Sequence, residues 1–261
     1  MLKIDAIFQR IASDCTTVTL VGKNAKIRAY AAWVLANCQP YAEQVIPALQ
    51  ECLTREEKQL VRASIMLSLG HLMPATEETH TFFMQLLGEQ TKPLLKITAG
   101  MAYAFAVKEA TPTEVVQVLL EGYQQSRALR EKFRRLPFAK VDMEASISKA
   151  FRSIGISIAP MVVPSLTHAL KRSDCWSGLV LVDNLLFLAL AGRIISPEMT
   201  VADLTDMQRE ALSALVKSKN VWGLGNMGFT VGHFFSPQYD LDFTFWGRKD
   251  VAQFLRGEDC N

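Results

Sequence analysis

Three segments of the chain share one pattern and decide the expected fold: residues 27–36 read IRAYAAWVLA, residues 61–70 read VRASIMLSLG, and residues 95–104 read LKITAGMAYA. Each begins with an apolar and a basic residue, continues with small and large apolar residues, and ends in a small residue. The basic residues lie at positions 28, 62 and 96, so the pattern recurs at a constant offset of 34 residues (28 to 62 and 62 to 96). A fixed period of this length is typical of repeat architectures. Each segment is predicted to be a helix whose small residues let a neighbouring helix approach closely.

Further amphipathic helices are predicted around these segments, because apolar residues recur at i, i+3 and i+4. The candidate helices span residues 41–53, 79–87, 113–123, 143–155, 160–170, 174–191, 205–216, 220–234 and 250–255. The second half of the chain keeps this alternation but loses the strict period. The β-branched run 16–21 is thin evidence for a strand, since a single strand has nothing to pair with. We therefore expect five to seven antiparallel helix pairs in sequence.

The segments ending at residues 36, 70 and 104, with their matched basic residues, resemble the repeats of HEAT-like and armadillo-like α-solenoids. The resemblance implies an all-α fold, an α-solenoid of HEAT-like antiparallel helix pairs that forms a single domain over residues 1–261. In such a fold, stacking supplies the core that no helix pair could bury alone. The clearest repeats are expected at 24–125, divergent repeats at 143–234, and a C-terminal cap at 235–261. The resemblance also implies a scaffold with an extended concave surface for partners.

The composition is that of a globular protein, and the net charge limits the classes of partner that the chain can bind. Apolar residues make up 49% and charged residues 21% of the 261 residues, so a large core needs no disulfide or metal support. The net charge of +2 excludes the extensive basic coat of a protein that binds nucleic acid indiscriminately. The N-terminus lacks the pattern of a secretory signal. The longest apolar stretch, 178–191, is too short for a membrane span and contains a central aspartate, so we expect a buried helix and no membrane segment.

Cysteine and histidine spacing gives further expectations. The five cysteines are widely spaced without a CxxC pair, and the four histidines show no metal-ligand spacing. We therefore expect a reducing, cytoplasmic location, no disulfide framework, no metal and no other cofactor.

The matched basic residues Arg28, Arg62 and Lys96 allow two interpretations. On helices that face the concave surface, they would present regularly spaced cations to a partner. Alternatively, they stitch neighbouring repeats together. Both interpretations remain open from the sequence.

The densest charge lies between residues 126 and 140, where six basic residues and one acid give a net charge of +5. We expect this basic run in a linker between two helix pairs, where it can contact an acidic protein surface or phosphate. The alternative is a solvated helix whose apolar side packs on the repeats. The run comprises Arg127, Arg130, Lys132, Arg134, Arg135 and Lys140.

Asp183 is the most unusual carboxylate, because it lies in an apolar helix and shares a face with Trp176 and Phe187. A carboxylate in such surroundings must be paired or have a raised pKa. It could act as a general base or bind a cation. The structural alternative is a pair with an arginine such as Arg152 or Arg193.

Alkylpurine DNA glycosylases of the HEAT-like type have an aromatic-lined, basic groove with a catalytic aspartate. Trp176, Asp183, Arg193 and Trp222 would supply these residue types, and the resemblance implies base extrusion as the mechanism. A phycobilin-lyase-like HEAT protein is a further alternative that no feature of the sequence indicates.

Two C-terminal segments have unusual composition, one rich in glycine and one rich in aromatic residues. Residues 223–228 read GLGNMG and match GxGxxG, but a helix precedes them where a dinucleotide site requires a strand. The aromatic segment 235–246 is expected to cap the last helix pair.

These features favour a non-enzymatic cytoplasmic scaffold or adaptor that binds another protein along its concave surface. The alternative is a nucleic-acid-binding HEAT-like protein, a class that includes DNA-repair glycosylases. No catalytic residue is predicted. The candidate partner-binding residues are Arg28, Arg62, Lys96, Arg127, Arg130, Arg134, Arg135, Trp176, Asp183 and Trp222.

Overall fold

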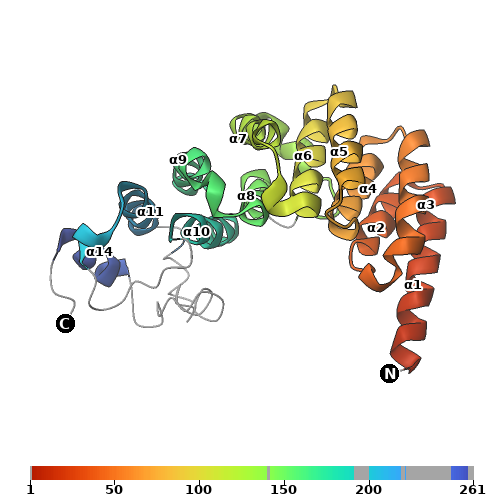
Figure 1. Ribbon diagram of the computed structural model, residues 1–261, viewed down its shortest axis with the longest axis horizontal. Helices are drawn as coiled ribbons and strands as arrows, with labels where there is room; N and C mark the ends of the chain where they lie inside the picture. The colour runs from red at the N-terminus through yellow and green to blue at the C-terminus, as the bar shows by residue number, and fades with distance from the viewer. Residues whose placement is uncertain (1, 140–141, 191–199, 219–220, 222–247, 258–261) are drawn as a thin grey trace. The chain divides into compact units, whose positions relative to one another are not determined.

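The computed structural model describes residues 2–139, 142–190, 200–218, 221 and 248–257, and every regular element among them is a helix (Figure 1). This confirms the predicted all-α fold class. The chain divides into two compact units, residues 1–143 and 144–261. The expectation that all 261 residues form one domain stays a prediction.

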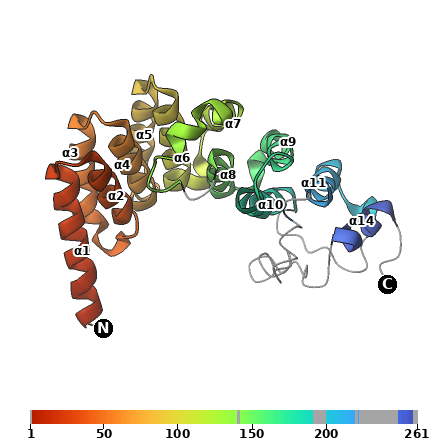
Figure 2. The same ribbon diagram turned by 180° about the vertical axis from the view of Figure 1, so that it is seen from behind.

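The N-terminal unit is built on a central row of three helices, α2 (Ala25–Leu35), α4 (Gln59–Leu72) and α6 (Pro93–Val107), which pack on one another in chain order. Helix α1 packs on α2, α3 on α4, and α5 and α7 on α6 (Figures 1 and 2). The bounds of these flanking helices are α1 Leu2–Val21, α3 Ala42–Arg55, α5 Glu77–Glu89 and α7 Thr113–Phe133. Short 3-10 helices precede α3 and α7: η1 Gln39–Tyr41 and η2 Lys108–Ala110.

The three segments that share the 34-residue period are helices, as predicted, and these helices form the central row. Ten of the fourteen residues of α4 and twelve of the fifteen of α6 are buried. A helix that is apolar on nearly all sides belongs inside a protein. Helices α4 and α6 of the row therefore form the core of this unit.

Small residues let the row helices approach closely, as the sequence predicts. The Ser68 hydroxyl of α4 donates a hydrogen bond to the Ala32 carbonyl of α2 at 2.6 Å. A Cβ placed on Gly70 would lie 2.4 Å from the carbonyl oxygen of Ala102 in α6. Only glycine fits at this crossing of the two backbones.

Helix α1 includes the β-branched run 16–21, so the weak strand evidence does not describe this segment. Two of its threonines bond their hydroxyls within the helix: Thr17 donates to the Ser13 carbonyl at 3.1 Å and Thr19 to the Cys15 carbonyl at 2.8 Å. The packing of α1 on α2 and α3 overrides the modest helix propensity of β-branched residues.

The C-terminal unit is also helical where it is described. Helix α9 packs on α10 and α11, α10 packs on α11, and α11 packs on α14. The predicted helix 220–234, apart from Val221, and the predicted cap segment 235–246 lie outside the described residues. The elements are α8 Met143–Ile154, η3 Ile156–Ile158, α9 Ala159–Leu170, α10 Cys175–Leu190, η4 Val201–Asp203, α11 Asp206–Lys217 and α14 Arg248–Arg256.

Within the described ranges, no single helix is long and apolar enough to cross a membrane. The segments Met143–Ile154 and Ile156–Leu170 pass by length and composition only when taken together, and they are bent by 114° at their junction.

Candidate partner-binding surface

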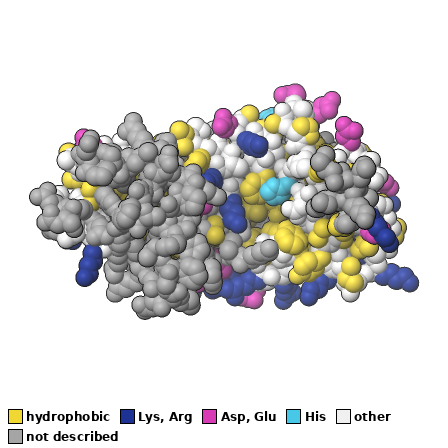
Figure 3. Space-filling view, turned by 90° about the horizontal axis from the view of Figure 1, so that it is seen from below, with side chains coloured by type: hydrophobic (Ala, Val, Ile, Leu, Met, Phe, Trp, Pro, Cys, Tyr) yellow, Lys and Arg dark blue, Asp and Glu magenta, His cyan; other side chains and the backbone are white. Residues whose placement is uncertain are grey.

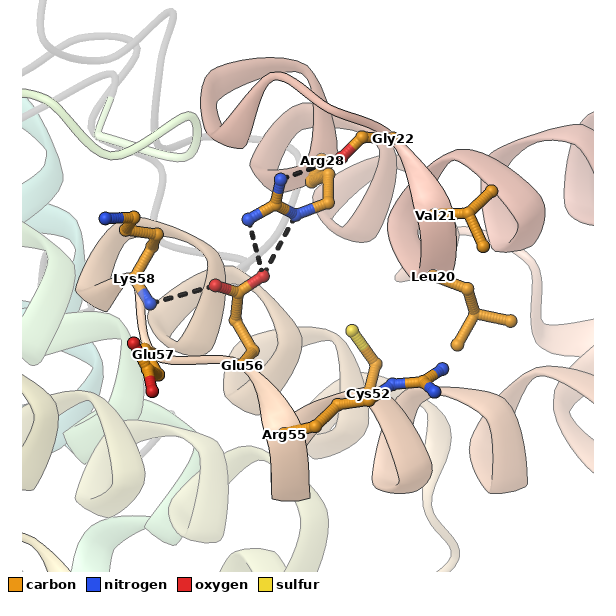
Figure 4. A pocket seen from close by; sticks show the side chains of 9 residues that line it. All are labelled: Leu20, Val21, Gly22, Arg28, Cys52, Arg55, Glu56, Glu57 and Lys58. Atoms are coloured by element: carbon orange, nitrogen blue, oxygen red, sulfur yellow. Dashed lines mark hydrogen bonds and ion pairs between the residues drawn. The ribbon is translucent and has the colours of Figure 1, made fainter.

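Arg28 joins three elements of the N-terminal unit (Figure 4). Its Nη1 donates to the Gly22 carbonyl oxygen at 2.7 Å, just beyond α1. Its Nε donates to Glu56 Oε2 at 2.9 Å, in the turn between α3 and α4. The Lys58 backbone N–H donates to Glu56 Oε1 at 2.9 Å, so both carboxylate oxygens are bound. The Arg28 and Glu56 side chains are largely buried.

A cavity of about 330 Å³ lies beside this ion pair. Figure 4 shows Leu20 and Val21 on one side of the cavity and Glu56 and Lys58 on the other. Arg28 and Glu56, which line the cavity, pair with each other. It is also lined by Cys52, Arg55, Glu57 and Lys58. Burial raises the pKa of the Cys52 thiol, which disfavours its reactive thiolate form.

Arg62 has a related role one repeat later. Like Arg28 in α2, it is the fourth residue of its helix. Its Nη1 donates to the carbonyl oxygens of Leu53 at 2.8 Å and Glu56 at 3.1 Å. The last carbonyls of a helix lack intrahelical partners and carry partial negative charge, so a guanidinium stabilises them. Lys96, the fourth residue of α6, is half-buried.

These contacts agree with the stitching interpretation for Arg28 and Arg62. Each cation fixes the start of a row helix to the end of the preceding helix. A role of Arg28, Arg62 and Lys96 in partner binding stays a prediction.

Arg209 makes the same kind of contact in the C-terminal unit, and the sequence analysis missed it. It is the fourth residue of α11, and its Nη1 donates to the carbonyls of Leu204 at 2.6 Å and Val201 at 3.2 Å. The 34-residue offset does not lead to it. A base four residues into a helix with an N-terminal capping box, Thr205 with Gln208, is the signal that would have found it.

The basic run lies only partly in a linker. That prediction is wrong for Arg127, Arg130 and Lys132, which lie in α7. Arg134 and Arg135 follow the helix, and Lys140 lies outside the described residues. Helix α7 continues to Phe133, because the buried residues Ser126, Leu129 and Phe133 extend the helical spacing of its packed face. The polar side of these last turns is solvated. The basic residues exposed there and in the following turn are Arg127, Arg130, Lys132, Arg134 and Arg135.

Asp142 partly neutralises this run. Its Oδ1 lies 3.8 Å from Arg130 Nε and 3.6 Å from Arg134 Nη2. The Arg130 and Arg134 side chains remain about half exposed. Exposed pairs of this kind contribute little stability, so these cations stay accessible to an acidic surface.

Asp183 is paired with Arg152, one of the two arginines named from the sequence. Arg152 Nη1 donates to Asp183 Oδ2 at 2.6 Å, and its guanidinium carbon lies 4.7 Å from the centre of the Phe187 ring. Burial raises the pKa of Asp183, while the charge and hydrogen bond of Arg152 lower it. Next to it, Asn184 donates to the Ser148 hydroxyl at 2.9 Å and ties α10 to α8.

The predicted site residues fall into two separate sets. The cations at 28, 62 and 96 and the basic run belong to the N-terminal unit, while Trp176 and Asp183 lie on α10 of the C-terminal unit. The Trp176 side chain, Arg193, Trp222 and residues 223–228 lie outside the described part of the structure. Within that part, no group of three His, Cys, Asp or Glu residues could hold a metal ion.

Exposed apolar side chains gather on the first two helices of the N-terminal unit. On α2, Ile27 is 57% and Tyr30 45% exposed, and Val21 at the end of α1 is 72% exposed. Figure 3 shows hydrophobic side chains gathered over the N-terminal helices, with Lys and Arg along one margin. The sequence analysis did not single out these residues, because the repeat pattern does not show which of the equivalent positions is left exposed.

The comparisons with known proteins agree with this geometry. Residues 27–55, from α2 to the end of α3, match the family model described as PBS lyase HEAT-like repeat. The chain therefore contains a HEAT-like repeat within an all-helical arrangement of packed helices. No curated protein and no solved structure matches it. The match covers one helix pair, so it describes the repeat and leaves the partner open.

Proposed function

We propose that this HEAT-like protein is a non-enzymatic scaffold or adaptor that binds another protein. HEAT-like repeats commonly mediate protein binding, since a row of helices presents a rigid, extended surface. The observation that supports the proposal most directly is the exposure of Ile27 and Tyr30 on a helix of the core row. Exposed apolar and aromatic side chains on a rigid element are favoured contacts for a partner protein.

The charged groups support the same proposal. Arg28 with Glu56, Arg62 with the end of α3, and Arg152 with Asp183 are all engaged within the fold. A general base or nucleophile needs a side chain that faces its substrate. These residues instead hold helices together.

The proposed location is the cytoplasm or another reducing compartment. Cys15, Cys38 and Cys52 are free thiols. Burial raises the pKa of each, which favours the protonated and less reactive form.

The proposal is tested by affinity purification of the chain from cells that contain it, with and without nuclease, followed by mass spectrometry. We expect a protein partner recovered in stoichiometric amount under both conditions. Loss of every partner after nuclease treatment would overturn the proposal.

Nucleic-acid binding is the second candidate, and the exposed basic side chains at the end of α7 favour it. Phosphate binding makes affinity fall steeply with salt, with a slope of about 0.9 per phosphate contacted on duplex DNA. Replacing Arg134 and Arg135 together by alanine is then expected to lower that slope by up to about 2. Affinity for duplex DNA that does not change with salt would exclude this candidate.

A further inference from the structure

The repeat register shows what normally covers one face of each row helix. Positions 61, 64 and 68 of α4 and positions 95, 98 and 102 of α6 are equivalent, because they differ by 34 residues. All six side chains are buried. Through this face each row helix rests on the preceding one: Ser68 bonds to Ala32 of α2, and Ala102 meets Gly70 of α4.

The equivalent face of α2 has no preceding row helix among the described residues. It consists of Ile27, Tyr30 and Val34, and we call it the row-end face. Ile27 and Tyr30 are exposed where their counterparts in α4 and α6 are buried. Within the described part of the N-terminal unit, the exposed large apolar side chains are confined to α1 and α2: Ile11, Val21, Ile27 and Tyr30.

The existing row contacts indicate the shape of the occupant. The surfaces that receive this face in the unit are small: Ala32 receives Ser68, and Gly70 receives Ala102. The row-end face is bulkier than its counterparts, since Tyr30 stands where α4 has Ser64 and α6 has Thr98. A complementary helix therefore needs small residues on its contact side to accept the Ile27 and Tyr30 side chains.

The charges around the face indicate the chemistry of the occupant. The sequence has no acidic residue between Asp14 and Glu43, and Lys23 and Lys26 are exposed at the start of α2. Arg28 is already paired with Glu56. One flanking helix separates successive row helices, so the row helices run in the same direction. A helix that continues the row would place its first turns beside these lysines, where acidic residues also suit its own dipole.

We propose that the row-end face binds an amphipathic helix of a partner protein, acidic in its first turns and lined with small residues on its contact side. The inference rests on the proposed protein-binding function and names its partner class. A second copy of the chain is a poorer occupant. In a dimer through this face, the large side chains Ile27 and Tyr30 of one copy would meet the same large side chains of the other. The lysines of the two copies would also repel each other.

The test uses the purified 261-residue chain with the photo-cross-linker p-benzoylphenylalanine in place of Tyr30. A matched control carries the cross-linker in place of Thr81, which is exposed on α5. Both proteins are added to a lysate of the source cells and irradiated, and the cross-linked peptides are sequenced. Unchanged circular dichroism and thermal unfolding show that the substitutions leave the fold intact.

We expect position 30 to capture a peptide of another protein with Asp or Glu in its first turns and Ala, Gly or Ser at three- and four-residue spacing. Capture of a peptide from this same chain, capture of a basic peptide, or no capture above the Thr81 control would overturn the inference. If a nuclease-resistant partner co-purifies while position 30 captures nothing, the inference fails and the proposed function stands.

A charge reversal tests the electrostatic part separately. Lys23→Glu combined with Lys26→Glu is expected to lower the cross-linking yield at position 30 several-fold. The matched control is Lys58→Glu combined with Lys92→Glu. These two lysines are exposed and precede α4 and α6, so they lie at the same end of helices inside the row. Equal yields from the two double variants would overturn the acidic partner class.

Discussion

At residue 183, burial and the ion pair shift the pKa of one carboxyl group in opposite directions. Burial raises the pKa of Asp183, and Arg152 counters the rise. Arg152→Ala removes the hydrogen-bonded cation and leaves the carboxylate, whose side chain is 28% exposed, with only the charge interaction of Lys149. At pH 7 we expect this variant to lower the free energy of unfolding by about 1–3 kcal/mol, the cost of leaving a buried charged group without its partner. Asp183→Asn replaces the charged carboxylate by a neutral amide, so we expect it to lower the free energy of unfolding by less than Arg152→Ala does.

The pH dependence of Arg152→Ala follows from the sign of the shift. A carboxyl group whose pKa is higher in the folded state than in the unfolded state favours folding when protonated, and this contribution is lost as pH rises through the folded-state pKa. Without Arg152 the pKa of Asp183 rises further, so acidification from pH 7 should bring the variant closer to the wild type in stability. Urea unfolding at pH 7 and in mild acid measures this. The prediction would be contradicted if the difference in free energy of unfolding between Arg152→Ala and the wild type did not change with pH. Equal losses of stability for Arg152→Ala and Asp183→Asn at pH 7 would also contradict it.

The same residues show what sequence can predict at this scale. From the sequence, Asp183 could be a general base, a cation ligand or the partner of an arginine, and the structure pairs it with Arg152. The choice between Arg152 and Arg193 depends on which helix packs beside α10, and local spacing does not encode that. Arg209 was missed for a related reason: its role comes from its position at a helix start, and it lies off the repeat period.

At the scale of the helix, Gly70 gives a sharp test. A Cβ there would meet the Ala102 backbone at 2.4 to 2.8 Å, so Gly70→Ala has to push α4 and α6 apart. We expect it to destabilise the protein by about 1–3 kcal/mol or more, as overpacking in a core does. Thermal or urea unfolding measures the change.

Gly88→Ala is the matched control. Gly88 lies in α5, and a Cβ there would meet nothing within 4 Å. It should stabilise the protein by up to about 1 kcal/mol, because alanine favours the helix. If both substitutions changed stability in the same direction and by a similar amount, the close approach of α4 and α6 would be contradicted.

Most helices were predictable because their apolar spacing is regular, and the exceptions have identifiable causes. Helix α1 was not anticipated, because its β-branched run favours a strand locally and its packing on α2 and α3 cannot be read from the local sequence. The last turns of α7 were not predicted to be helical, because their basic residues were interpreted as a linker. Residues 126, 129 and 133 nevertheless keep the helical spacing, so the pattern was present in the sequence.

At the scale of the whole molecule, the N-terminal unit contains its own buried row and should fold alone. We expect a fragment of residues 1–139 to be helical and to unfold cooperatively in urea, as monitored by circular dichroism. A fragment of residues 1–107 lacks α7, which covers Ile97 and Gly100 of α6, and should be less stable. A non-cooperative transition of the 1–139 fragment would instead support a single domain over the whole chain.

The partner surface could not be predicted at this scale, for a physical reason. Ile27, Val61 and Leu95 are equivalent and apolar, so the sequence treats them alike. Two are buried and one is exposed, and the difference lies only in whether another helix precedes them in the row. A repeat pattern encodes how a helix packs and does not mark where packing stops.

The contacts of Glu56 have an evolutionary consequence. Its carboxylate binds Arg28 and the Lys58 amide, and its carbonyl accepts from Arg62, so one short turn fixes two repeats. An inserted residue in this turn would break all three bonds at once, whereas residues 74–76, between α4 and α5, are exposed. Length variation among descendants of this sequence should therefore accumulate at residues 74–76 and spare residues 55–59.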